Sequence, residues 1–236
     1  DTELALKAMT ESAMKDTCGY SMGYFVGLEN YRKYGYVPCD MEMESVARTL
    51  EYAFDDRALA RFAEQIGRSE EAAYFNEQSF NYKNVFDADI CFVRGKTKEG
   101  KWRTPFAPLS SSHRKDDYCE GNAWQWSFFV PHDVEGLAAL MGGKERLAAR
   151  LDSLFTMSSA LEGDDVSGDI SGLIGQYAHG NEPGHHTIYM YNKVGQPYKT
   201  QKYVNQVLTT LYNNTPDGIC GNEDTGQMSA WYVFSA

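Results

Sequence analysis

The sequence predicts an all-α fold built from stacked helical hairpins. Apolar residues recur three and four positions apart over most of the chain, which is the spacing of one helix face. Long polar loops separate these segments, and the alternation typical of strands is almost absent. A plain helical bundle is the alternative, but bundles join their helices by short connections. Because the loops here are long and carry the unusual residues, hairpins whose loops gather into a pocket are favoured.

Each expected helix has its own local signal. Residues 41–80 have the strongest periodicity and predict two consecutive helices separated near Asp55 and Asp56, followed by a third from the N-cap residue Ser69 to about residue 82. Further helices are expected over residues 3–14, 131–141, 143–155, 185–191, 197–212 and 227–235. Residues 87–113 are interrupted by glycine and proline, so they predict a long loop with a short strand pair around residues 91–102.

Size and composition limit the possible functions. One large domain over residues 1–236 is expected, as part of a longer protein, because the chain stops on an unfinished apolar element. The net charge of -11 would repel nucleic acid, and no apolar run is long enough to cross a membrane. The five cysteines lack zinc-site spacing, although Cys119 and Cys220 adjoin candidate motifs. The 16 Tyr, 12 Phe and 4 Trp weakly indicate sugar binding.

The first candidate motif surrounds Glu120. Small residues and Trp124 flank this glutamate, and a partly desolvated carboxyl group has a raised pKa, which suits a proton donor. A surface or helix-capping glutamate is the alternative.

The second candidate motif is the loop at residues 221–226, where Glu223 and Asp224 lie between two glycines before a helix. A helix N-terminus favours anions, so at least one of these carboxylates is expected to stay ionised and serve as a base or a cation ligand. Simple capping of the helix by Asp224 or Thr225 is the alternative.

The third candidate motif, residues 179–186, contains three histidines beside Asn181 and Glu182. A zinc site is conceivable, but the spacing matches no common zinc motif. Oxygen ligands on a glycine-rich backbone better suit a hard cation such as calcium. The alternative is a helix start at Pro183 with one capping histidine and the others buried. The nearby aspartates at positions 164, 165 and 169 are expected to lie in a solvated loop, since they lack the complete EF-hand pattern.

Four long segments, residues 120–136, 172–186, 195–201 and 216–236, closely resemble glycoside hydrolase family 92, the calcium-dependent exo-acting α-mannosidases. The resemblance covers essentially the whole chain. It implies an (α/α)6 toroid as catalytic domain, preceded in the whole protein by a β-sandwich. It also implies an α-mannoside or N-glycan substrate and a periplasmic or extracellular location.

The resemblance implies an inverting reaction in which Glu120 is the acid and Asp224 the base. In inverting enzymes the two carboxyl groups lie roughly 6.5–9.5 Å apart, which leaves room for the attacking water. Some members carry an acid where this chain has Asn222, which can orient water but cannot accept its proton. Glu223 is a less favoured base. The alternative to an enzyme is a non-catalytic mannose-binding relative, which has no need of a placed acid and base.

The same resemblance supplies the remaining site residues. Calcium (Ca²⁺) would be held by Asn181 and Glu182 and would contact mannose hydroxyls. The expected sugar contacts are Trp124, His185, His186 and Gln227. Any of these four can instead support the direct ligands from behind.

Overall fold

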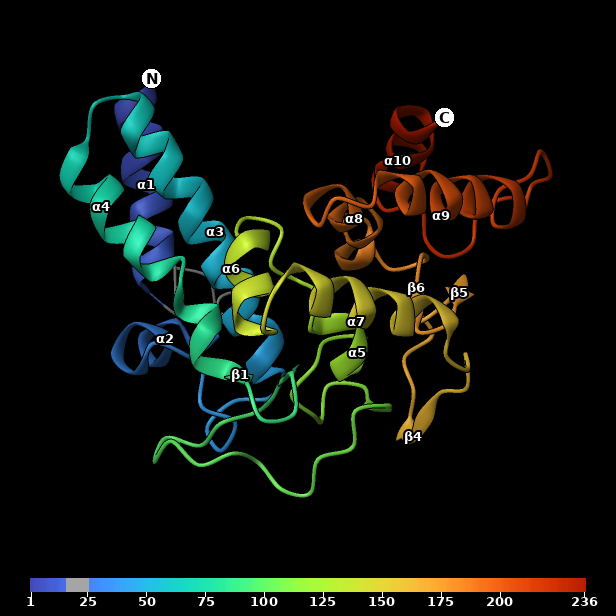
Figure 1. The fold of residues 1–236 in the computed structure, drawn as a ribbon. Coiled ribbons are helices and arrows are strands. Elements are labelled where there is room, and N and C mark those ends of the chain that lie inside the picture. The colour runs from blue at the N-terminus through green and yellow to red at the C-terminus, as the bar shows by residue number, and fades with distance from the viewer. Residues whose placement is uncertain (16–25) are drawn as a thin grey trace. The chain divides into compact units, whose positions relative to one another are not determined.

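The computed structural model describes residues 1–15 and 26–236, and these group into two compact units. The first unit contains residues 1–106 and 115–118, and the second contains residues 107–114 and 119–236. Helices dominate both units, and the described strands are short (Figure 1). The predicted all-α class is confirmed in this respect.

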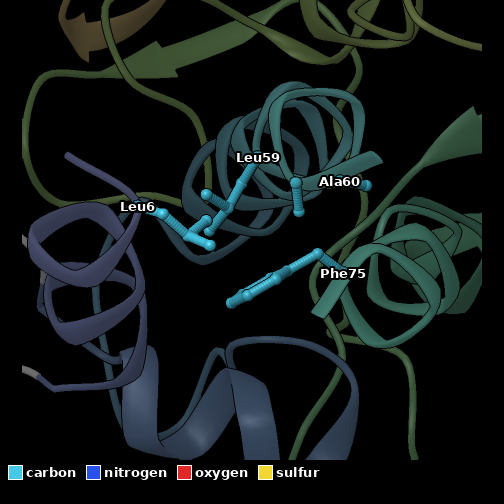
Figure 2. Packing of buried hydrophobic residues seen from close by; sticks show 5 residues of the cluster. Leu6, Leu59, Ala60 and Phe75 are labelled. Atoms are coloured by element: carbon cyan, nitrogen blue, oxygen red, sulfur yellow. The ribbon is translucent and has the colours of Figure 1, made fainter. Parts of the chain in front are cut away.

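Over its described residues, the first unit contains four α-helices, a 3-10 helix and a small hairpin. They are α1 (Thr2–Met14), α2 (Leu28–Tyr34), α3 (Ser45–Gln65), α4 (Ser69–Gln78), the 3-10 helix η1 (Asn81–Val85), β1 (Phe86–Asp87) and β2 (Phe92–Val93). Strands β1 and β2 pair antiparallel, and Lys96 forms an isolated bridge with Trp102. Helices α1, α3 and α4 lie side by side (Figure 1). Their apolar faces meet in a cluster of Leu6, Leu59, Ala60, Ala63 and Phe75 (Figure 2).

Helix α3 corrects the expected break near Asp55 and Asp56, because it continues unbroken through both residues. Asp56 is 1% exposed, yet its carboxylate accepts hydrogen bonds of 2.6 and 2.7 Å from Arg32 and one of 2.9 Å from the Tyr31 hydroxyl. A buried carboxylate is tolerated where charge-assisted hydrogen bonds replace its water. Asp56 therefore marks a point where α2 contacts α3 rather than a helix end.

The second unit holds six helices and two small strand pairs. The helices are α5 (Ala123–Trp126), α6 (Val134–Leu140), α7 (Lys144–Thr156), α8 (Met190–Lys193), α9 (Pro197–Thr210) and α10 (Gln227–Ser235), with 3-10 turns η2 (Glu182–Gly184) and η3 (Thr187–Tyr189). Strand β3 (Ser110–Ser112) pairs parallel with β4 (Glu162–Asp165), and β5 (Leu173–Ile174) pairs antiparallel with β6 (Tyr177–Ala178). An aromatic stack of Phe155, Tyr177, Tyr191 and Tyr203 forms part of this unit's core.

The long amphipathic helices of this unit match their predictions closely. Helix α7 buries Leu147, Leu151 and Leu154, and Asp133 caps α6 by accepting a hydrogen bond from the Gly136 amide at 3.0 Å. The helix expected over residues 185–191 is instead split between η3 and α8. Helices α2 and α5 were not predicted, since seven and four residues are too short to establish a clear period.

Candidate active site

The candidate site residues all lie in the second unit. Several line a small cavity of about 30 Å³, which has room for a water molecule or two. The cavity lining comprises Glu120, Gln125, Trp126, Phe129, Leu154, Tyr177, Ala178, Asn181, Pro183, Gly184 and Thr187. It therefore joins the motif around Glu120 to the motif at residues 179–186, which lie about sixty positions apart in the sequence.

Glu120 sits on a backbone held from both sides. Its φ is +46°, a left-handed conformation that is uncommon outside glycine. The Trp126 indole donates to the carbonyl oxygen of Cys119 at 2.8 Å, and the Asn181 amide donates to the carbonyl oxygen of Glu120 at 3.0 Å. Directly after it, Asn122 caps α5 in a capping box with Gln125. The half-buried carboxyl side chain is thus placed at the cavity by fixed neighbours.

Three glycines bring the loops of the site into direct backbone contact. A Cβ atom at Gly180 would lie 2.3 Å from the Cys220 carbonyl oxygen and 2.0 Å from Ser171 Oγ. One at Gly221 would lie 2.5 Å from the Gly180 carbonyl oxygen, and one at Gly172 would lie 2.4 Å from Cys220 Sγ. Only glycine permits such approaches. This glycine crossing fixes residues 171–172, 180–182 and 220–224 relative to one another.

Asp224 also has a left-handed backbone, with φ of +45°, and Thr225 follows it at +55°. The Asp224 side chain is exposed, and within the described residues its carboxylate has no hydrogen-bond partner. Capping of α10 falls instead to Glu223, whose carboxylate accepts from the Ser229 amide at 3.0 Å, a bond that lowers the pKa of Glu223. The capping alternative for Asp224 and Thr225 therefore does not describe this loop.

The carboxyl group of Glu182 is influenced by three other acidic side chains of the site. Burial raises the pKa of its carboxyl group, and the negative charges of Asp224, Glu120 and Asp169 raise it further. The loops that meet at the glycine crossing and the segment that carries Glu120 therefore bring four acidic side chains near one another. Asp169 was expected in a solvated loop, but it is half-buried and accepts hydrogen bonds from Ser167 Oγ at 2.7 Å and Asn222 Nδ2 at 3.2 Å. No spacing in the sequence connects Asp169 to the other carboxylates.

The residues proposed for calcium match that ion in chemical type. Glu182 Oε1 is buried and lacks a hydrogen-bond partner, so it is an oxygen with unfilled capacity beside Asn181. Calcium takes six to eight oxygen ligands, including carbonyl groups and water. Over residues 1–15 and 26–236, no three His, Cys, Asp or Glu side chains are grouped closely enough to form a metal site by themselves. The described side chains therefore suit part of a calcium coordination shell.

All three histidines of the 179–186 motif are held by specific partners. His179 is fully buried between the hydroxyl groups of Tyr177 and Tyr212, each 2.8 Å from a ring nitrogen, and burial lowers its pKa to about 3. His185 donates through Nε2 to the His179 carbonyl oxygen at 3.0 Å. His186 donates through Nε2 to the Phe128 carbonyl oxygen at 2.8 Å, and burial lowers its pKa to about 4.

The expected sugar contacts occupy different positions. Gln227 is exposed, and its Nε2 lies 3.4 Å from Nδ1 of His185. Because Nε2 of His185 carries the ring proton, Nδ1 accepts this hydrogen bond. Trp124 is buried, and the Arg150 guanidinium lies 4.0 Å from the centre of its ring. Trp126, two positions further on, is the tryptophan that lines the cavity. Sequence reasoning missed Gln125, Trp126 and Tyr177, although all three lie within or beside the quoted motifs.

Over residues 1–236 the sequence matches the glycosyl hydrolase family 92 catalytic domain. The chain therefore belongs to glycosyl hydrolase family 92. Its structure is similar to that of a family 92 α-mannosidase from Bacteroides thetaiotaomicron in complex with mannoimidazole, with 41% identity and a TM-score of 0.89 over 99% of this chain and 30% of that one. An inverting mannosidase of the same family and organism has 40% identity and a TM-score of 0.85 over 100% of this chain and 33% of that one.

A curated relative, an uncharacterized secreted glycosidase of Arthroderma benhamiae, is 27% identical over 264 residues, which cover 100% of this chain and 32% of the relative. The chain thus spans about a third of the length of the proteins it resembles. Among the described residues, no helix has both the length and the apolar character required to cross a membrane.

Proposed function

We propose that the protein containing this chain is an inverting exo-α-mannosidase that releases terminal mannose from α-mannosides or N-glycans. The observation that carries the proposal is what Glu120 and Asp224 have in common. Both have left-handed backbones, and both act electrostatically on the same carboxyl group, that of Glu182. Strained backbone of this kind is concentrated at functional sites. The family 92 mannosidases with similar structures support the choice of substrate.

Glu120 and Asp224 divide the chemistry between them. Glu120 protonates the glycosidic oxygen as the bond to the leaving sugar breaks. Asp224 accepts a proton from the water that attacks the opposite face of the mannose ring, which inverts the anomeric configuration. Asn222 donates to Asp169 and lies two positions before the base, where its amide can orient the water but cannot take its proton. The proton transfer from water therefore falls to Asp224.

Calcium would be held by Glu182 and Asn181. When bound, it would engage mannose hydroxyl groups and favour a ring distorted toward the oxocarbenium-like transition state. Asn181 would link the two functions, because its amide nitrogen also fixes the Glu120 backbone. The sugar itself would meet Gln227, which His185 orients, while His186 and Trp124 would support the pocket from behind.

The two units of this chain would form part of a single catalytic domain, an (α/α)6 toroid, completed in the whole protein by a β-sandwich. The long loops of the second unit would then face one end of the toroid and form the substrate pocket. The secreted relative supports an extracellular or periplasmic location, where glycan substrates are available.

A non-catalytic mannose-binding protein is the competing function. Glu120 and Asp224 argue against it, because a binding site for a neutral sugar does not require two carboxylates on strained backbone. Binding of mannose without turnover by the full-length protein would favour it.

The test compares Glu120→Gln and Asp224→Asn in the full-length protein on two aryl α-mannosides. The 2,4-dinitrophenyl leaving group departs without protonation, so this substrate should restore most of the activity lost by Glu120→Gln. It should not restore Asp224→Asn, which still lacks a proton acceptor for water. Full activity of either variant on 4-nitrophenyl α-mannoside would contradict its assigned role.

A further inference from the structure

Three hydrogen-bonded rings, of which two are buried and one is half-buried, connect the cavity to the loop that carries Asp224. Tyr177 lines the cavity, and its hydroxyl group lies 2.8 Å from Nδ1 of His179. Nε2 of His179 lies 2.8 Å from the Tyr212 hydroxyl, which donates to the Met228 carbonyl oxygen at 3.2 Å. The two bonds to His179 are within ordinary hydrogen-bond distance, and the bond from Tyr212 to Met228 is longer than most O–H···O hydrogen bonds.

The protons of this chain have one consistent arrangement. The Met228 carbonyl oxygen can only accept, so the single Tyr212 hydroxyl proton is directed toward it. The Tyr212 oxygen must then accept a proton from Nε2 of His179. Nδ1 of His179 is left with its lone pair and accepts from the Tyr177 hydroxyl group. His179 is therefore a neutral imidazole protonated at Nε2, and the Met228 carbonyl oxygen determines this tautomer.

His179 has no unused hydrogen-bonding group. Its amide donates to the Gly172 carbonyl oxygen at 3.2 Å, and its own carbonyl oxygen accepts from Nε2 of His185 at 3.0 Å. Its ring stacks on that of His185 with centroids 4.8 Å apart and meets Trp231 edge-on at 4.4 Å. A side chain held in this way is a rigid support for whatever it bonds.

Tyr212, the last ring of this hydrogen-bonded series, holds the turn that contains Asp224. Met228 receives the Tyr212 hydrogen bond at its carbonyl oxygen, and its amide donates to the Glu223 carbonyl oxygen at 3.3 Å. The next amide back, that of Gln227, donates to the Asp224 carbonyl oxygen at 3.1 Å. The left-handed backbone at Asp224 is therefore anchored through Met228 and Tyr212 to His179, two positions before Asn181.

We propose that His179 and Tyr212 are positioning residues that hold the Asp224 carboxylate at the correct distance from the sugar and from Glu120. The proposal rests on the proposed function of Asp224 as the base. Loss of the Tyr212 hydroxyl group would release the turn at residues 223–228 while the cavity and Glu120 keep their contacts. The base would then be misplaced and substrate binding would be little changed.

Tyr212→Phe in the full-length protein tests this directly, because it removes one hydroxyl group and keeps the ring that stacks on Trp231 at 6.2 Å. We expect kcat to fall about 10- to 100-fold, as for a small misplacement of a reacting group, with KM changed less than about threefold. The matched control is Tyr191→Phe, which removes a partly buried hydrogen bond of 2.9 Å to Asp152 in the same unit and should leave kcat unchanged.

Leaving-group dependence separates this role from a general loss of structure. Tyr212→Phe should remain impaired on 2,4-dinitrophenyl α-mannoside, as Asp224→Asn does, whereas Glu120→Gln recovers. The positioning role is overturned if Tyr212→Phe keeps wild-type kcat, loses no more kcat than Tyr191→Phe, or recovers on the activated substrate. Each of these results leaves the proposed function of the protein unaffected. No turnover by the wild-type protein would overturn the proposed function and this inference with it.

A second pair of variants applies if Tyr212→Phe does not fold. His179→Gln places an amide near the position of Nε2 and can still donate to Tyr212, whereas the shorter His179→Asn reaches only toward Tyr177. The inference requires the glutamine variant to keep several-fold more kcat than the asparagine variant. The reverse order would overturn it.

Discussion

At the scale of single residues, Glu120 and Asp224 share a conformation that few non-glycine residues adopt. A left-handed backbone at such a residue costs on the order of 1–3 kcal/mol and persists only where the surroundings hold it. Here the surroundings are specific: Asn181 and Trp126 hold the backbone at Glu120, while the capped turn of α10 holds Asp224. Glu120 and Asp224 are two of the six described non-glycine residues with positive φ, and they are the two carboxylates to which the proposed reaction assigns proton transfer.

Glu223 and Asp224 are adjacent acids with different surroundings, and this difference predicts different mutational effects. Glu223→Gln should keep most of the activity, because Glu223 is engaged with the Ser229 amide at the start of α10. Asp224→Asn should reduce kcat by several orders of magnitude. Steady-state kinetics of both variants on one aryl α-mannoside provide the comparison. Equal losses would show that the base role is shared.

Gly180 predicts a packing effect at the glycine crossing. In Gly180→Ala, the added methyl group would meet the Cys220 carbonyl oxygen and Ser171 Oγ at distances that no pair of atoms sustains. We expect a destabilisation of about 1–3 kcal/mol together with loss of activity, since the loops of Asn181 and Asp224 must separate. Gly168→Ala is the control, because open space surrounds that position. Thermal unfolding and turnover of both variants are the measurements. Equal stability and equal activity of Gly180→Ala and Gly168→Ala would contradict the role of the glycine crossing.

At the scale of secondary-structure elements, long periodic helices could be predicted from the sequence and short or irregular ones could not. Helices α7, α9 and α10 each repeat an apolar face or begin at a clear signal, and they occur close to where they are expected. The break predicted in α3 was wrong because Arg32, 24 residues away, compensates the charge of Asp56. Such a partner lies outside any local sequence window.

The candidate site shows the same division between local and distant information. Motif composition pointed to Glu120, Asn181, Glu182 and Asp224, and their expected chemical roles remain predictions. The participation of Asp169 could not be predicted, because it depends on the glycine crossing between segments some fifty residues apart. The same holds for Tyr212, whose role emerges only from the hydrogen bonds on either side of its hydroxyl group.

Helix α3 carries a pH-dependent contribution to stability. Burial, and then the charge of Asp55, raises the pKa of half-buried Glu51 from 4.5 to about 7. Because the folded state binds this proton more tightly, the stabilisation is fully present below about pH 4.5 and is lost as pH rises toward 7. Glu51→Gln should therefore stabilise the protein at pH 7.5, by on the order of 2 kcal/mol, and have little effect at pH 4.5. Thermal unfolding of both proteins across this pH range is the measurement, and an unchanged difference at every pH would contradict the assignment.

At the scale of the whole molecule, the residues proposed as acid, base and calcium ligands all lie in one compact unit of the chain. The proteins it resembles are about three times as long, so the complete pocket is expected to include further segments. The net charge of -11 would repel polyanions from this part of the protein. The proposed function therefore has to be tested on the whole protein, by measuring which anomer of mannose is released first and whether its release requires calcium.

The most direct test is proton NMR of the full-length protein cleaving an aryl α-mannoside, following the anomeric signal of the first mannose released with and without a calcium chelator. The account predicts initial β-mannose, loss of turnover on chelation and recovery when calcium is returned. Initial α-mannose would contradict the placement of Glu120 and Asp224 as an inverting pair.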